Sequence, residues 1–195
     1  MKNQKHIGLD FDDVIFDMCG SIVEYHNKNY GTNLTRDDMV SFEFSDVWKC
    51  SIPETQRRVW EFFDSPEHQV SEPVPDAIEH VKELLDNYKV TIVTARPETH
   101  MVPTKKWLEN HVPELLPYMH FTNGFGGGVK REKGEVCKEL GIDIFVEDAP
   151  IHIESVSKTV PQVYLFDMPW NKALVDLPKN VERVHSWADL REKLL

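Results

Sequence analysis

The amino-acid sequence predicts an α/β fold with a five-stranded parallel sheet, helices on both faces of the sheet, and a small helical cap inserted between the first two strands. Short apolar runs rich in β-branched residues alternate with amphipathic helical patterns, which is typical of βαβ units. The chain has 195 residues, enough to bury one sizeable core. The stretch between the first two apolar runs is too long for one crossover helix, and this length indicates an insertion.

Five apolar runs are expected to form the strands. Each contains β-branched or aromatic residues and stops at polar or chain-breaking residues, such as the Ala95-Arg96-Pro97 sequence after the second run. In chain order, the predicted strands cover residues 6–11, 88–94, 119–122, 142–147 and 162–166. Because helical segments separate them, we expect the strands to lie parallel in a single sheet.

Helical patterns fill the segments between these strands. In residues 75–87, apolar side chains recur at helical spacing. Residues 103–110 begin with a proline, which suits the first turn of a helix, and residues 132–140 end at Gly141, a common C-terminal stop. Helices of this length between strands predict that both faces of the sheet are covered.

Residues 17–73 are expected to form the cap, because they carry several helical signals separated by breaks such as Gly31. The predicted division is a core of residues 1–16 and 74–195 and a cap of residues 17–73. The cap is rich in aromatic residues, and two readings of them remain open. They could pack the cap's own small core, or they could line a pocket for a flat ligand, with Trp48 and Trp60 as candidates.

The charge balance argues against polymeric partners. The chain has 22 Lys and Arg against 33 Asp and Glu, a net charge of −11. Residues 36–76 hold ten acidic and four basic side chains, a balance of −6. Such acidity opposes binding of nucleic-acid polymers or anionic membranes. No stretch approaches the roughly 18 apolar residues of a transmembrane helix, so a cytoplasmic protein is expected. A homodimer is compatible with these features.

Two aspartates stand where the first predicted strand ends. Asp10 and Asp12 are two residues apart, so an extended backbone projects their side chains to the same side. In open α/β sheets, ligands bind beyond the carboxyl ends of the strands. Two carboxylates at that edge can bind a divalent cation and act as nucleophile and as acid/base.

Matching polar residues occur at the ends of other strands. Thr94 ends the second predicted strand, and Glu147 and Asp148 end the fourth. Lys130 and Lys133 lie in the glycine-rich approach to the helix before the fourth strand, where cationic groups and free N–H groups would both favour a phosphate. The set therefore suggests a phosphate site with a metal ion beside it.

This ordered set resembles the haloacid dehalogenase (HAD) superfamily of aspartate-nucleophile phosphotransferases. The resemblance spans residues 7 to about 148 and includes the position of the cap. Within the superfamily, the chain looks most like bacterial 5'(3')-deoxyribonucleotidase-like proteins. The residues that carry this likeness are Asp10-Phe-Asp-Asp-Val14, Val93-Thr-Ala-Arg-Pro97, Trp107-Leu108 and Phe166-Asp-Met-Pro-Trp-Asn171. The resemblance implies a Rossmann-like core.

The resemblance also implies the mechanism of a Mg²⁺-dependent phosphomonoesterase. Asp10 would attack phosphorus and form an aspartyl phosphate, while Asp12 would protonate the leaving group and later deprotonate water. Thr94, Ala95 and Lys133 would hold the phosphoryl oxygens, with Lys130 as the alternative lysine. Mg²⁺ would be bound by the Asp10 carboxylate, the Asp12 carbonyl, and either Glu147 or Asp148.

Departures from the family pattern concern two positions. Asp13 stands where these relatives often have glycine, and the acidic pair is Glu147-Asp148 where two aspartates are usual. Arg96, two residues after Thr94, could reach the phosphate or the cap, or form an ordinary surface salt bridge.

Nucleoside monophosphates are the substrate that the resemblance and the cap aromatics favour. A sugar phosphate or another small phosphorylated metabolite is the alternative within the same chemistry. A HAD-like protein that binds phosphate or nucleotide without turnover is a third reading. A receiver-like signalling module fits less well, because the candidate nucleophile lies after the first strand and a large insertion follows it.

Overall fold

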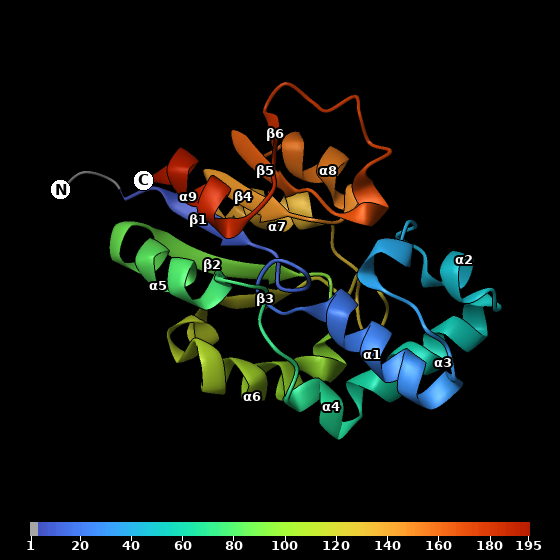
Figure 1. Cartoon of the computed structure of the whole chain (residues 1–195). Helices are drawn as coiled ribbons and strands as arrows, with labels where there is room; N and C mark the ends of the chain where they lie inside the picture. Colours follow the sequence, from blue (N-terminus) through green and yellow to red (C-terminus); the bar gives the residue numbers. More distant parts are fainter. Residues whose placement is uncertain (1–3) are drawn as a thin grey trace.

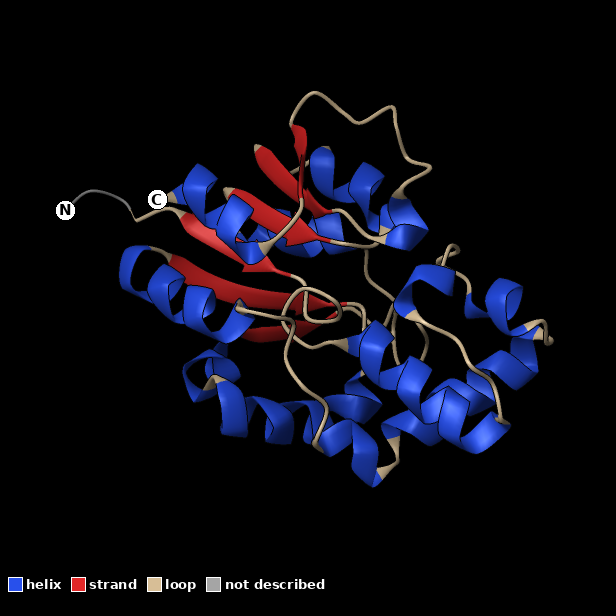
Figure 2. Ribbon diagram, in the orientation of Figure 1, coloured by secondary structure: helices blue, strands red, loops and turns tan. Residues whose placement is uncertain are grey.

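A computed structural model describes residues 4–195, so Met1–Asn3 of the expected core lie outside it. The described chain forms an α/β fold around one parallel sheet with strand order β3-β2-β1-β4-β5-β6 (Figures 1 and 2). The strands are β1 (His6–Leu9), β2 (Lys89–Thr94), β3 (Met119–Phe121), β4 (Ile144–Glu147), β5 (Gln162–Phe166) and β6 (Val181–Val184). The predicted fold class is thereby confirmed.

The sheet has six strands, and the expected number of five was wrong. β6 pairs in parallel with β5, with Val181 and Val184 opposite Val163 and Phe166. Only these two ends of β6 are buried, since Glu182 is exposed and Arg183 half-buried. A four-residue edge strand with two charged residues has no apolar run, which explains why the sequence pattern missed it.

Helices cover both faces of the sheet. Side chains of α5 (Ala77–Asn87), α6 (Met101–His111) and α9 (Trp187–Leu194) share one apolar cluster with Leu9 and Val146. Side chains of α7 (Lys133–Leu140) and α8 (Pro150–Ser157) pack with Phe145 and Val163 in a second cluster on the other face. Four short 3₁₀ turns complete the described chain: η1 (Arg36–Asp38), η2 (Glu98–His100), η3 (Pro113–Tyr118) and η4 (Pro169–Asn171). No helix within residues 4–195 is long and apolar enough to cross a membrane.

Four helices lie beyond the carboxyl ends of the strands (Figure 1). In the sequence they come between β1 and α5. They are α1 (Met18–Tyr30), α2 (Phe44–Trp48), α3 (Ile52–Phe63) and α4 (Pro66–Gln69). The Asp17 side chain caps α1 by accepting from the Gly20 amide, and Gly31 ends it with a φ of 66°.

The chain leaves the sheet and returns to it through two paired segments. The Asp17 amide donates to the Glu72 carbonyl at 3.1 Å, and the Val74 amide donates to the Ile15 carbonyl at 2.8 Å. Phe16 and Pro73 face each other in an antiparallel bridge. These backbone bonds fix where residues 17–73, called the insertion below, join the sheet.

The contact between α7 and α8 supplies a test of the packing. A Cβ atom built on Gly134 would lie 2.2 Å from the Ser155 carbonyl oxygen, a backbone atom that cannot move without shifting α8. We expect Gly134→Ala to lower the free energy of unfolding by about 1–3 kcal/mol, because the clash outweighs the gain in helix propensity. Urea denaturation would measure this change.

Glu135→Ala on the same helix is the matched control for Gly134→Ala. The Glu135 side chain is exposed, so its removal should change the free energy of unfolding by no more than about 0.5 kcal/mol. Equal stability of Gly134→Ala and the parent protein would contradict the described packing of α7 against α8.

Candidate active site

Three carboxylates meet at the carboxyl edge of the sheet. Asp10 follows β1, Glu147 ends β4, and Asp148 comes next; β1 and β4 are neighbours in the sheet. Ligand oxygens of these three residues lie within 4.8 Å of one another, and all three side chains are buried. The parallel pairing of β1 and β4 thus brings together carboxylates that are distant in the sequence.

Lys133 links two of these carboxylates. Its Nζ lies 2.7 Å from Asp10 Oδ2 and 2.8 Å from Glu147 Oε2, and the side chain is fully buried. Lys130 is placed differently: its side chain is 64% exposed and lies 4.0 Å from Glu132. Of the two candidate lysines, only Lys133 is therefore in contact with the carboxylate cluster.

Burial shifts the proton affinities of this cluster. Burial raises the pKa of Asp10 to about 7, and the nearby Glu147 carboxylate acts in the same direction. Burial and the Glu147 charge also raise the pKa of Asp148 well above its usual range. Burial alone would lower the pKa of Lys133, but Asp10 and Glu147 raise it above its ordinary value. One cation among three carboxylates leaves an excess of negative charge, which favours a second cation at this place.

The two acidic residues after β4 differ in how many partners they have. Glu147 Oε1 accepts from the amides of Asp148 and Ala149, both at 3.1 Å, while its Oε2 is taken by Lys133. Asp148 Oδ2 accepts from Trp170 Nε1 at 2.9 Å, whereas no group within residues 4–195 bonds Oδ1. Carboxylate oxygens are suitable ligands for Mg²⁺, so the donor set fits this ion, with Asp148 holding the free oxygen.

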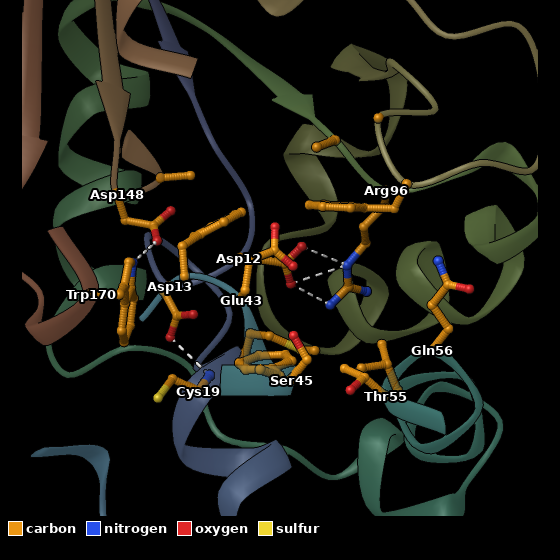
Figure 3. A pocket seen from close by; sticks show the side chains of 18 of the residues that line it. Asp12, Asp13, Cys19, Glu43, Ser45, Thr55, Gln56, Arg96, Asp148 and Trp170 are labelled. Atoms are coloured by element: carbon orange, nitrogen blue, oxygen red, sulfur yellow. Dashed lines mark hydrogen bonds and ion pairs between the residues drawn. The ribbon is translucent and has the colours of Figure 1, made fainter. Parts of the chain in front are cut away.

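Asp12 is paired with Arg96. Arg96 Nε lies 3.1 and 3.0 Å from the two carboxylate oxygens of Asp12, and Nη2 lies 2.6 Å from Oδ1 (Figure 3). The Arg96 side chain is only 1% exposed. The sequence-based reading of an ordinary surface salt bridge is therefore wrong, because the guanidinium is buried beneath the site.

Residues after β2 form a tight turn at the same edge of the sheet. Thr94 is fully buried, and its Oγ1 accepts from the Arg96 amide at 3.1 Å. Ala95 and Arg96 line the adjoining cavity, whereas Thr94 lies just behind them. The turn thus places Ala95 and the Thr94 hydroxyl on the β2 side of Asp10.

A cavity of about 440 Å³ opens above the carboxylates, between the sheet edge and the insertion. Figure 3 shows the labelled side chains of Asp12, Asp13, Asp148, Trp170 and Arg96 converging on it. Aromatic residues line it from both sides: Phe42, Phe44, Trp60 and Phe63 from the insertion, and Phe125 and Trp170 from the remainder of the chain.

The two tryptophans proposed from the sequence have different positions. Trp60 lines the cavity and stacks on His100 with ring centroids 4.7 Å apart. Trp48 does not line the cavity; it is buried between His26 and Phe44, whose ring centroids lie 4.4 and 4.9 Å away. Of the two readings of the cap aromatics, Trp48 fits packing within the cap and not lining of the pocket, because α2 turns this side chain toward α1.

Sequence reasoning did not single out two residues that line the cavity. Phe125 lies in the glycine-rich segment after β3, and its ring centroid is 6.4 Å from that of Phe42. His152 is buried on α8, and its Nε2 has no hydrogen-bond partner within the described chain. Its position one helical turn after Asp148 is the signal that could have identified His152.

Comparisons with known proteins agree with this geometry. The model of the family described as "5' nucleotidase, deoxy (Pyrimidine), cytosolic type C protein" matches residues 4–195. A Bacillus cereus protein named "Putative nucleotidase" is 26% identical over 187 residues, which are 94% of this chain and 94% of that protein.

Two solved structures share the fold at low sequence identity. A HAD family hydrolase from Deinococcus radiodurans with bound phosphate and sodium has a TM-score of 0.70 at 14% identity, covering 98% of this chain and 95% of that one. The HAD-hydrolase YfnB from Bacillus subtilis, bound to magnesium, has a TM-score of 0.62 at 13% identity, covering 99% of each chain. Together with the family match, these findings show that the chain belongs to the cytosolic type C family of deoxy (pyrimidine) 5' nucleotidases within the HAD superfamily and is a phosphomonoester hydrolase.

Proposed function

We propose that this protein hydrolyses nucleoside monophosphates in a Mg²⁺-dependent reaction that passes through a phosphorylated Asp10. The observation that carries the proposal is the contact of Asp10 with Lys133 at the base of a cavity whose upper walls are aromatic. The charged base suits a phosphate, and the aromatic walls suit a nucleobase. The nucleotidase family supports this substrate class, and its description as cytosolic supports a cytoplasmic location.

Asp10 is the proposed nucleophile. Its oxygen would attack phosphorus as the bond from phosphorus to the ester oxygen breaks, and Asp12 would give a proton to the departing oxygen. Water would then attack the aspartyl phosphate, with Asp12 taking the proton. Lys133 and the turn of Thr94 and Ala95 would hold the phosphoryl oxygens as charge develops.

Mg²⁺ is the proposed cofactor, and Asp10, the Asp12 carbonyl and Asp148 are its proposed ligands. The free Oδ1 of Asp148 favours this residue over Glu147, whose oxygens already have three partners. The ion would supply positive charge that lets a phosphate dianion approach the carboxylates. The magnesium-bound YfnB and the phosphate-bound Deinococcus hydrolase, which share the fold, are compatible with this assignment.

The insertion is proposed to act as a cap that binds the nucleoside. Trp60, Phe63, Phe42 and Phe44 present aromatic surface to the cavity, and bases stack readily on such side chains. Ser41, Ser45 and Thr55 line the same cavity and offer hydroxyl groups to a sugar. A sugar phosphate would use the hydroxyl groups but gain little from the aromatic residues, so the nucleotide is the preferred substrate.

The nucleophile is tested with Asp10→Asn. With Mg²⁺ and a panel of nucleoside 5'- and 3'-monophosphates, we expect kcat to fall by at least about 10³-fold, because an amide cannot form the aspartyl phosphate. Adding EDTA to the parent protein should also abolish release of inorganic phosphate. Asp167→Asn is the matched control, since Asp167 follows β5 but does not line the cavity. Hydrolysis that survives Asp10→Asn would rule out this nucleophile.

The assignment of the phosphate lysine is tested by a pair of substitutions. Lys133→Met should lower kcat/KM by about 10²-fold, because it removes a charge that would face the transferring phosphoryl group. It should also lower the melting temperature, since Asp10 and Glu147 would lose their buried partner. Lys130→Met, at an exposed position, should change kcat/KM by less than about 2-fold. A larger loss with Lys130→Met than with Lys133→Met would reverse the assignment.

The base-binding role of the insertion is tested by comparing Trp60 with Trp48. Trp60→Ala should raise KM for nucleoside monophosphates by about 10-fold, as expected for one lost stacking contact, and leave KM for 4-nitrophenyl phosphate nearly unchanged. Trp48→Ala should lower the melting temperature instead, because it leaves a void in the insertion. Identical KM values of Trp60→Ala and the parent protein for every nucleotide would argue against stacking on this ring.

A further inference from the structure

Arg96 forms hydrogen bonds to two further residues besides its salt bridge with Asp12. Its Nε and Nη2 bond the Asp12 carboxylate, and its Nη1 lies 3.1 Å from His68 Nε2 and 3.0 Å from Thr104 Oγ1. All but one of the guanidinium N–H groups therefore have a partner. We infer that Arg96 is a positioning residue that holds the Asp12 carboxylate where it can deliver a proton to the leaving oxygen, an inference that rests on the proposed function.

The partners of Arg96 are themselves fixed. Thr104 Oγ1 donates to the His100 carbonyl at 2.7 Å, so it accepts from Arg96. Because Arg96 Nη1 can only donate, His68 Nε2 must also accept, which places the proton of a neutral imidazole on Nδ1. The Gln69 amide nitrogen lies 3.2 Å from Nδ1, so the amide must turn its oxygen, which has no partner within residues 4–195, to this side. The pKa of His68 is lowered to about 3, by burial first and by the Arg96 charge second, in agreement with a neutral ring. The guanidinium orientation is thus determined on the side away from Asp12.

Aromatic rings enclose the guanidinium. Its central carbon lies 4.6, 4.7 and 4.8 Å from the ring centroids of Phe11, Phe16 and Phe63. Arg96 borders the cavity, but with 1% of its side chain exposed it offers a substrate almost no surface. Asp12 is 24% exposed and lines the cavity, so its carboxylate is the part of this pair that a ligand meets. Arg96 can therefore act on the reaction only through Asp12.

The contacts of Arg96 also join the insertion to the rest of the site. His68 belongs to α4 in the insertion, Thr104 belongs to α6, and Asp12 follows β1. One rigid, planar group thus fixes the acid/base relative to three separate elements. A lysine could keep the charge at this place, but it lacks the fork that bonds both Asp12 oxygens.

The inference predicts a dependence on the leaving group. Proton delivery matters most when the departing oxygen is strongly basic and matters little when it is stable as an anion. Phenyl phosphate and 4-nitrophenyl phosphate are similar in shape, but phenol is a much weaker acid than 4-nitrophenol. Their kcat/KM values cover the steps up to release of the phenol, so the later attack of water on the aspartyl phosphate does not enter the comparison.

The experiment measures kcat/KM for both aryl phosphates with the parent protein, Arg96→Met and Arg96→Lys. We expect Arg96→Met to lower kcat/KM by about 100-fold for phenyl phosphate and by less than about 5-fold for 4-nitrophenyl phosphate, because a misplaced acid hinders only the first. Arg96→Lys should lie between Arg96→Met and the parent protein.

Arg58→Met is the control for loss of another arginine that contacts a carboxylate, a histidine and an aromatic ring, although Arg58 is half-buried. Arg58 pairs with Glu54, lies 2.9 Å from His26 Nε2 and covers the Tyr30 ring at 4.1 Å, but it does not line the cavity. Arg58→Met should lower the melting temperature and leave the ratio of the two kcat/KM values as in the parent protein.

The outcomes separate this inference from the proposed function. If the parent protein hydrolyses the aryl phosphates and Arg96→Met lowers both kcat/KM values by the same factor, Arg96 has only a structural role and the inference is overturned. If Arg96→Met does not fold, Arg96→Lys alone decides. The inference is then overturned if Arg96→Lys keeps the parental ratio of the two kcat/KM values. A parent protein that hydrolyses neither nucleotides nor aryl phosphates would overturn both the proposed function and the inference.

Discussion

The buried contact of Lys133 with Asp10 and Glu147 is the interaction on which the site depends. Taking carboxylates out of water is costly, and a single lysine with two short contacts offsets part of that cost. The remaining excess of negative charge keeps the pKa values of Asp10 and Asp148 raised. A site of this kind favours a cation, and with the cation in place it can accept a phosphate. The buried carboxylates that are costly for folding therefore make the site suitable for phosphate chemistry.

The sheet and its helices position that contact. β1 and β4 are adjacent, so Asp10 and Glu147 meet at one edge although 137 residues separate them in the sequence. Lys133 begins α7, and the absence of a side chain on Gly134 lets α7 lie directly against the backbone of α8. A side chain at that position would push α7 away and move Lys133 from the carboxylates. The packing of α7 against α8 thus helps to set the distance from Lys133 to the carboxylates.

The sequence allowed much of this arrangement to be predicted, and the reasons for the failures are physical. Strand periodicity predicted the fold class, and the polar residues at strand ends predicted that Asp10 lies near Glu147 and Asp148. The sequence left Lys130 and Lys133 as alternatives, and only Lys133 contacts these carboxylates. β6 was missed because a half-buried edge strand has no continuous apolar run. The burial of Arg96 and the different positions of Trp48 and Trp60 depend on contacts between the insertion and the sheet, which local patterns do not encode. The types of side chain at the strand ends indicated a phosphate site with a metal ion. Long-range packing determines which residues line the cavity.

Asp13 illustrates how the fold accommodates a departure from the family pattern. Its φ of 54° lies in the left-handed region, where glycine has no steric cost and aspartate is one of the few other residues that occur. The Asp13 carboxylate accepts from the Cys19 amide at 2.9 Å in the first turn of α1 and lies 3.4 Å from Arg36 of the insertion. Burial still raises the pKa of Asp13 to about 7, but these donors partly compensate for it. The Asp13 carboxylate, which also lines the cavity, thus bonds to α1 and η1 and can strengthen the junction with the insertion.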